Sequence, residues 1–193
     1  MIALLIRVII PIYLLIMLYL YVKVCNGLFG IDIALKLLNR KNYKVLKNFD
    51  FYGKNSENYH IDYLVLSVHG VFIINVIKLF GKIYGKENDR NWMHIYRNKE
   101  TLIPNYSSQI TQITKEIGNM LDLGHGKALF IPILVIKNAR LNISTGTTIV
   151  RQSKLTQFIK MYNYIFPITN NDMCEMINKI EFVNINENGV IVL

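Results

Sequence analysis

The chain contains few of the residues that cross-link or interrupt a fold: two cysteines, four prolines and one tryptophan among 193 residues. Two cysteines, Cys25 and Cys174, are too few for a disulfide scaffold or for a zinc site built from cysteine. Acidic residues are also scarce, 13 against 22 Lys and Arg, and the formal net charge is +9. Such a surplus favours anionic partners, either nucleic acid or acidic lipid. A hydrophobic content of 52% with 18% charged residues excludes an intrinsically disordered chain.

One long hydrophobic run stands at the start of the chain, where residues 2–22 carry a single charged side chain, Arg7. A helix rises about 1.5 Å per residue, so this run extends about 31 Å, close to the thickness of a bilayer core. We therefore expect one N-terminal transmembrane helix as an anchor over residues 1–25, followed by one domain over residues 26–193. A cleaved signal peptide, a lipoprotein signal at Cys25 and a buried core helix are the alternatives.

The charges that follow this run predict how the anchor is oriented. Residues 23–54 contain Asp32 and Asp50 but a larger set of basic residues, namely Lys23, Lys36, Arg40, Lys41, Lys44, Lys47 and Lys54. Positively charged flanks of a membrane helix stay in the cytoplasm. We therefore expect a single-pass protein of the cell membrane whose C-terminal domain is cytoplasmic, a compartment that also suits cysteines with no evident pairing.

Beyond the anchor, hydrophobic periodicity predicts a mixture of strands and helices. Alternating or continuous apolar runs predict strands at 43–52, 59–67, 70–78, 82–85, 92–97, 128–136 and 147–150. Helical spacing predicts helices at 28–40, 106–122, 153–165 and 171–181, and a terminal hairpin is expected over 182–193. The fold class is therefore α/β (α+β), in one domain.

Two of these strands form the most informative predicted feature, a hairpin that turns at Val68 and His69. Antiparallel pairing around that turn places Asp62 directly opposite Asn75, with side chains on one face about 4.5–5.5 Å apart at Cβ. A carboxylate and an amide at that spacing are able to contact one divalent cation. His60 shares the face and is a further candidate ligand, although a surface histidine is the simpler interpretation.

The same hairpin carries a family resemblance. Residues 61–85, together with Trp92 and the sequence NYSSQ at 105–109, resemble the nuclease-related domain (NERD) family. The resemblance extends roughly over residues 27–155, and it implies a PD-(D/E)xK endonuclease-like fold, a mixed sheet flanked by helices. The family pattern has an early Gly-Glu, an Asp, then Glu-x-Lys, and finally Asn-Pro-x-x-Gln at the start of a helix.

Carried over residue by residue, this pattern is only partly present. Asp62 and Gln109 match the Asp and the Gln of the family. Asn75 replaces the Glu, Ile77 replaces the Lys, and Ile31 replaces the early Glu. The resemblance therefore implies a vestigial catalytic centre, in which Asp62 alone would hold a metal weakly.

These changes predict an inactive centre that needs no cofactor. The alternative is a working Mg²⁺-dependent nuclease that uses Asp62, Asn75, Lys78 and Gln109. Strand alternation places Lys78 on the face opposite Asn75, so this alternative requires a β-bulge at 75–78 to redirect its side chain.

A basic and aromatic stretch follows the hairpin, and it predicts a nucleic-acid interface. Its candidate residues are Lys82, Lys86, Arg90, Trp92 and Arg97. A solvated lysine-rich surface is the plain alternative. The favoured function is a membrane-anchored domain that binds nucleic acid or a protein partner, with no small-molecule substrate in evidence. A structural component of a membrane assembly, with its basic segment on acidic lipid, is a further alternative.

Overall fold

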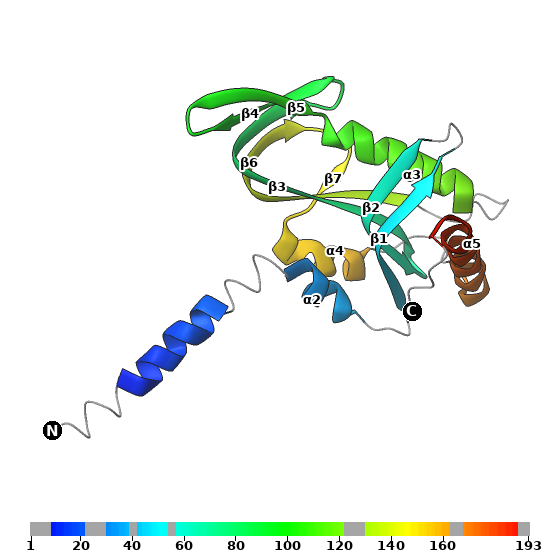
Figure 1. Cartoon of the computed structure of the whole chain (residues 1–193), viewed down its shortest axis with the longest axis horizontal. Helices are drawn as coiled ribbons and strands as arrows, with labels where there is room; N and C mark the ends of the chain where they lie inside the picture. The colour runs from blue at the N-terminus through cyan, green and yellow to red at the C-terminus, as the bar shows by residue number, and fades with distance from the viewer. Residues whose placement is uncertain are drawn as a thin grey trace. The chain divides into compact units, whose positions relative to one another are not determined.

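The computed structural model describes residues 9–21, 30–38, 42–53, 57–121, 130–162 and 168–188. The chain forms two compact units, Met1–Leu37 and Leu38–Leu193. The second unit holds a seven-stranded sheet with helices on both of its faces (Figure 1). The predicted mixed α/β architecture is therefore confirmed.

The sheet is built around one long strand, β3. Its strands are β1 (Tyr43–Tyr52), β2 (Asn58–Ser67), β3 (Gly70–Lys86), β4 (Asn91–Tyr96), β5 (Lys99–Pro104), β6 (Phe130–Ser144) and β7 (Thr148–Ile149). The first five follow one another in the order β1-β2-β3-β4-β5, and each neighbouring pair is antiparallel. β6 runs parallel to β3, and β7 runs parallel to β6.

One edge of β3 changes its partner half-way along. β2 pairs with β3 up to Tyr63↔Ile74, and β4 pairs with it from Lys82↔Ile95 onward. The other edge pairs with β6 from Val71 to Lys86. Residues 75–81 therefore lie in the gap between two antiparallel partners, and the strands predicted at 70–78 and 82–85 are one strand.

Three helices of the second unit cover the two faces of the sheet. They are α3 (Tyr106–Leu121), α4 (Leu155–Met161), which follows a short 3₁₀ turn, and α5 (Asn170–Asn188). The first unit contains a separate helix, α2 (Gly30–Lys36). α3 and α5 share one core cluster with Val71 and Ile73 of β3. Phe72 points to the other face, where its ring meets Tyr162 just after α4. The predicted apolar stripe of α3 is confirmed, since Ile110, Ile113, Ile117 and Leu121 are buried.

Some expectations differ from the structure or fall outside the part of the chain that it describes, and one strand was not expected. The terminal hairpin expected over residues 182–193 is wrong for residues 182–188, which continue α5, and its last residues, 189–193, lie outside the described ranges. β5 was not expected, because charged residues interrupt its alternation. Among the described residues, no helix is long and apolar enough to cross a membrane. Residues 9–21 are helical, while the rest of the expected anchor and the boundary at residue 25 lie outside the described ranges.

Candidate functional site

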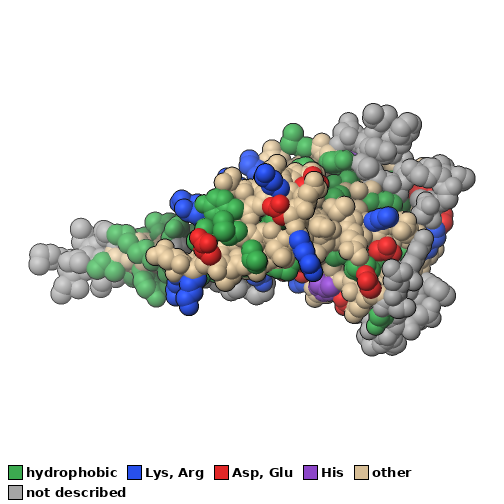
Figure 2. Space-filling model, turned by 90° about the horizontal axis from the view of Figure 1, so that it is seen from above, with side chains coloured by type: hydrophobic (Ala, Val, Ile, Leu, Met, Phe, Trp, Pro, Cys, Tyr) green, Lys and Arg blue, Asp and Glu red, His purple; other side chains and the backbone are tan. Residues whose placement is uncertain are grey.

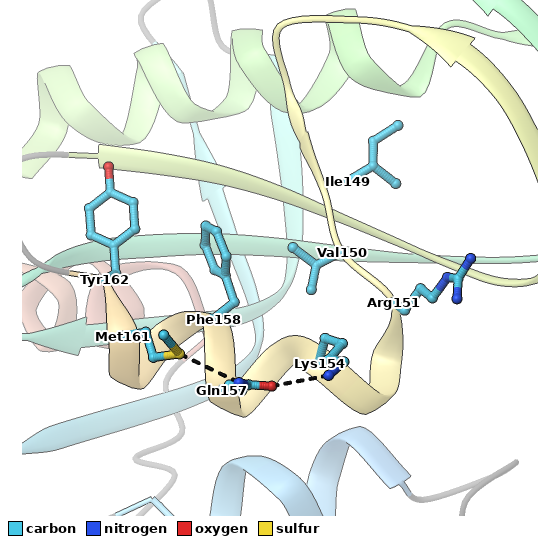
Figure 3. Close-up of a pocket in the computed structure, with 8 residues that line it drawn as sticks. All are labelled: Ile149, Val150, Arg151, Lys154, Gln157, Phe158, Met161 and Tyr162. Atoms are coloured by element: carbon cyan, nitrogen blue, oxygen red, sulfur yellow. Dashed lines mark hydrogen bonds between the residues drawn. The ribbon is translucent and has the colours of Figure 1, made fainter.

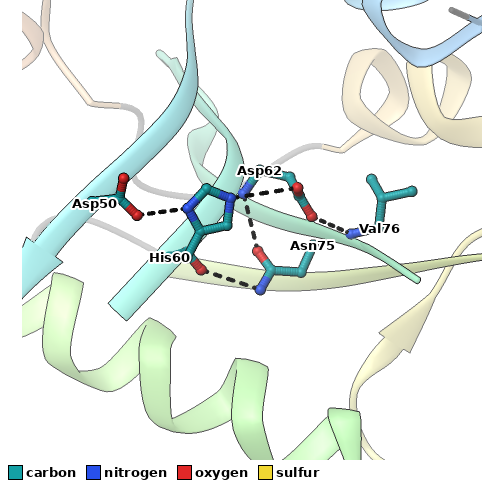
Figure 4. Close-up of polar contacts among 5 residues, drawn as sticks. All are labelled: Asp50, His60, Asp62, Asn75 and Val76. Atoms are coloured by element: carbon teal, nitrogen blue, oxygen red, sulfur yellow. Dashed lines mark hydrogen bonds and ion pairs between the residues drawn. The ribbon is translucent and has the colours of Figure 1, made fainter. Parts of the chain in front are cut away.

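The hairpin register brings Asp62 and Asn75 together as predicted. The β2–β3 pairs run from Ser67↔Gly70 to Tyr63↔Ile74, and Asp62 and Asn75 are the next residues in the same register. They stand at the start of the gap in the edge of β3. Their side chains come close enough to hydrogen-bond the opposite strand (Figure 4).

These two side chains form a reciprocal clamp between β2 and β3. The Asn75 carboxamide accepts a hydrogen bond from the Asp62 backbone N–H and donates one to the His60 carbonyl, both at 3.3 Å. The Asp62 Oδ2 accepts the Val76 backbone N–H at 2.7 Å. Asp62 and Asn75 therefore supply the hydrogen bonds that the backbone ladder no longer provides where the strands separate.

A third polar residue joins the clamp from the solvent side. His60 Nδ1 lies 2.6 Å from Asp50 Oδ1, and His60 Nε2 lies 3.7 Å from Asp62 Oδ1. Asp50 and His60 are direct partners in the β1–β2 register, which explains the short contact. The His60 and Asp50 side chains are about half exposed, at 52% and 49%, so the group is open to water.

The remaining predicted catalytic residues do not join this group. Lys78 is exposed, and the only register irregularity of the β3–β6 pair lies after it, between Lys78 and Gly81. The bulge at 75–78 that the nuclease alternative requires is therefore absent, and alternation directs Lys78 away from Asn75. Ile77 packs against a second core cluster around Trp92. Gln109 is exposed on the first turn of α3, and no side-chain hydrogen bond links it to Asp62 or Asn75.

The donors at this position do not fit Mg²⁺, which prefers several oxygen ligands in octahedral geometry. One Asp62 oxygen is engaged by the Val76 amide, and the Asn75 carboxamide is engaged by the backbone of β2. Across the described ranges, no three side chains of His, Cys, Asp or Glu converge as metal ligands. The position therefore lacks the second carboxylate that a magnesium site on this hairpin needs.

A comparison with known protein families identifies the family of this chain. Residues 27–137, more than half of the chain, match the family described as nuclease-related domain. The chain belongs to the nuclease-related domain family. The predicted resemblance is thus confirmed, and Asp62, Asn75 and Ile77 all lie inside the matched region.

One curated relative and no solved structure match this NERD chain. The relative, described as an uncharacterized protein of Bacillus anthracis, is 34% identical over 68 residues. That match covers 35% of this chain and 32% of the relative, so the chain spans about a third of the relative's length. No solved structure matches the chain at a significant level.

The predicted role of Trp92 as a base-stacking residue in the NERD domain is wrong. Its side chain is fully buried, and its indole N–H donates to the Lys86 carbonyl at 3.1 Å. A Cβ at Gly85 would lie 2.1 Å from the ring, so the glycine makes room for it. Trp92 is therefore a core residue that fastens β4 to β3.

The other predicted interface residues remain on the surface. Lys82, Lys86 and Arg90 are exposed, and Arg97 is exposed in the turn between β4 and β5, with its guanidinium carbon 5.1 Å from the centre of the Tyr96 ring. Positive φ angles at Arg97 and Asn98, 49° and 60°, are those of a tight hairpin turn. Figure 2 shows basic, acidic and hydrophobic side chains interspersed on one face of the molecule.

Like charges face each other along β3 and β6. Lys82 stands opposite Arg140 and Lys78 stands opposite Lys137 in the parallel register. Lys82 and Arg140 are both exposed, and no acidic side chain of the described part of the chain pairs with either. Phe80 and Tyr96 are 58% and 40% exposed, with ring centres 6.2 Å apart. We call Lys78, Lys82 and Arg140 the basic ribbon.

Asn105 is an organising residue whose role the sequence alone did not reveal. Its carboxamide donates to the carbonyls of Glu87 and Asp89 at 2.7 Å, and its oxygen accepts the Ser108 N–H at 3.1 Å. Asn105 therefore caps α3 and at the same time holds the turn that leads into β4. A capping residue before a predicted helix was the available signal.

A tyrosine links α3 to the start of β2. The Tyr59 hydroxyl donates to the Glu57 carboxylate and accepts from Gln112 Nε2 at 2.9 Å. The hydrogen bond to Glu57 raises the pKa of Tyr59 above its ordinary value, because the carboxylate stabilises the protonated phenol. This contact fixes α3 over the hairpin.

A pocket of about 490 Å³ lies between β7 and α4 (Figure 3). Phe158, Val150 and Tyr162 form its apolar wall, and Arg151 and Lys154 stand at its rim. It shares no residue with the Asp62–Asn75 clamp, so it is separate from the predicted centre.

Proposed function

We propose that this NERD domain binds nucleic acid along its basic ribbon without cleaving it, and that its N-terminal apolar segment anchors it in the cell membrane. In this proposal the domain lies in the cytoplasm and keeps the endonuclease-like fold that the resemblance implies. The observation that carries the binding proposal is the exposed Lys82–Arg140 pair.

The clamp supports the absence of cleavage. Metal-dependent hydrolysis of a phosphodiester needs a metal-bound hydroxide as the nucleophile and a cation near the negative charge that develops in the transition state. Here the Asn75 amide replaces a carboxylate and holds the backbone of β2 instead. Ile77, which occupies the position of the family lysine, packs against the apolar core.

The like charges of the ribbon support an anionic partner. Two cations directly opposite each other on neighbouring strands destabilise a sheet, typically by a few tenths of a kcal/mol. An anion that bridges them removes this cost, and phosphates along a nucleic-acid backbone offer negative charges at regular spacing. Phe80 and Tyr96 are also exposed, with ring centres 6.2 Å apart, and exposed aromatic rings suit base stacking.

The membrane part of the proposal rests on the apolar sequence of residues 2–22. The described part of that segment is a helix whose large apolar side chains are all exposed, from 46% at Leu20 to 67% at Tyr21. Exposed apolar surface of this extent favours contact with lipid. Membrane fractionation tests it, since deleting residues 2–22 is expected to move the protein to the soluble fraction, and an unchanged distribution contradicts the anchor.

Salt-dependent binding to the full chain in detergent tests the nucleic-acid proposal. We expect the affinity for a labelled single-stranded oligonucleotide to fall steeply with salt, by about one power of the salt concentration for each phosphate contacted. Lys82→Glu with Arg140→Glu should weaken binding at least tenfold and flatten this salt dependence. Lys115→Glu on α3 changes charge away from the ribbon and serves as the matched control.

The same samples distinguish the alternatives. Cleavage of plasmid or RNA with Mg²⁺, abolished by Asp62→Ala, would establish the working nuclease and overturn the proposal. Binding that is insensitive to salt, or equally weakened by Lys115→Glu, excludes the ribbon as the interface. A complete lack of binding leaves a protein partner or a structural role in a membrane assembly.

A further inference from the structure

His60 stands between two carboxylates, and it contacts them unequally. The Nδ1–Asp50 Oδ1 distance of 2.6 Å is that of a charge-assisted hydrogen bond. The Nε2–Asp62 Oδ1 distance of 3.7 Å is too long for a hydrogen bond, although the two atoms face each other (Figure 4). The His60 ring is therefore held by a hydrogen bond at Nδ1, whereas its Nε2 makes no hydrogen bond to Asp62.

The short contact determines which nitrogen keeps a lone pair. A carboxylate accepts hydrogen bonds, so Nδ1 must carry the proton that points to Asp50. In the neutral ring Nε2 then has a lone pair directed toward Asp62. On Asp62 the Val76 amide engages Oδ2, which leaves Oδ1 available. Two electron-pair donors thus face each other across a gap.

We propose that His60 Nε2 and Asp62 Oδ1 bind one first-row transition-metal ion of the Zn²⁺ class. With metal–ligand distances of about 2.1 Å, tetrahedral coordination places two ligand atoms about 3.4 Å apart, so a contraction of about 0.3 Å closes the site. Asp50 acts as the positioning residue, because metal-bound histidines characteristically donate their other N–H to a carboxylate. Water completes the coordination, since His60 is 52% exposed.

The donor set defines the class of ion and separates this site from the Mg²⁺ expected for the family. An imidazole nitrogen suits Zn²⁺, Co²⁺ or Ni²⁺, whereas Mg²⁺ requires oxygen ligands. Neither Asp50 nor His60 belongs to the family pattern that Asp62 and Gln109 match. Both proposed ligands lie on β2 and the positioning residue Asp50 lies on β1, so the site is independent of any binding at the basic ribbon.

Titration of the full chain in detergent with Zn²⁺, Co²⁺ and Mg²⁺ tests the site. All variants carry Cys25→Ser and Cys174→Ser, which removes thiolates as competing ligands. We expect one Zn²⁺ per chain, with affinity reduced at least tenfold by His60→Gln or Asp62→Asn and about 10–100-fold by Asp50→Asn. His94→Gln is the matched control, because His94 Nε2 already contacts the Phe80 carbonyl at 2.6 Å.

A second readout guards against variants that misfold. Zn²⁺ should raise the melting temperature of the parent and of His94→Gln, because an ion that binds only the folded state stabilises it, but not that of His60→Gln. Equal Zn²⁺ affinity in the parent and His60→Gln overturns the proposal. So does the absence of Zn²⁺ binding, or Mg²⁺ binding that matches that of Zn²⁺.

Discussion

The two halves of β3 differ in their burial and in their antiparallel partner. From Gly70 to Ile74 every residue is buried, with β2 and β6 on the edges and helices over both faces. From Asn75 to Lys86 the antiparallel partner changes, and Lys78, Phe80, Lys82 and Lys86 are exposed. The first half of β3 is thus buried throughout, whereas the second half combines residues of the Trp92 core cluster, such as Ile83, with exposed ones. Stability and function can therefore be changed separately along it.

The largest expected effect is on the buried half. Ile73→Ala removes a fully buried side chain and should lower the free energy of unfolding by about 2–5 kcal/mol. Ile77→Ala removes a side chain that is only partly buried, so it should lower the free energy of unfolding clearly less than Ile73→Ala does. Denaturant unfolding of both variants measures the difference, and equal losses would refute the division of β3.

The clamp marks the boundary between the halves, and its loss should have an intermediate effect. Asn75→Glu removes the donor to the His60 carbonyl and places a second carboxylate beside Asp62, so we expect the free energy of unfolding to fall by about 1–2 kcal/mol. Asn142→Glu on the exposed part of β6 is the control. A variant that keeps its stability would show that the clamp is dispensable.

Neutralising the ribbon should hardly change stability. Lys82→Gln removes one of two facing cations on an exposed surface, so the free energy of unfolding should change by no more than about 0.5 kcal/mol, in the stabilising direction. Thermal melts in low salt measure this change. A large destabilisation would mean that Lys82 has a structural role and that the second half of β3 is not free for binding.

The smallest effect concerns Tyr59, which packs against the core cluster of the first half. Its raised pKa means that the folded state favours the phenol. The contribution of this contact is complete below the ordinary pKa of 10.0 and disappears as pH rises through the higher pKa of the folded state. The absorbance titration of the parent minus that of Tyr59→Phe should therefore have its midpoint above 10.0. A midpoint at or below this value contradicts the hydrogen bond to Glu57.

Local patterns predicted the first half of β3 better than the second. The register of Asp62 and Asn75 followed from alternation and the position of the turn, which act over a few residues. The strand at 43–52 and the buried face of α3 followed from periodicity in the same way. The merging of 70–78 with 82–85 could not be predicted, because it depends on β6, which is distant in the sequence.

Residues of the candidate site were predictable only where their partners were local. Tryptophan is a residue type that often stacks on bases, so the sequence favoured that role for Trp92. The space left by Gly85 and the packing of β4 instead place its side chain in the core. The contact between Asp50 and His60 depends on the β1–β2 register, and the double role of Asn105 depends on a turn in another part of the chain.

The sequence by itself determined the family, the hairpin and the loss of the Glu-x-Lys pair, since each is a matter of residue type and short spacing. Only the tertiary structure decided that Asn75 and Asp62 hold the open edge of β3, that Trp92 is buried and that His60 has a carboxylate on either side. The physical reason is that hydrogen bonds and burial depend on which distant strands become neighbours, and a one-dimensional pattern does not specify these neighbours.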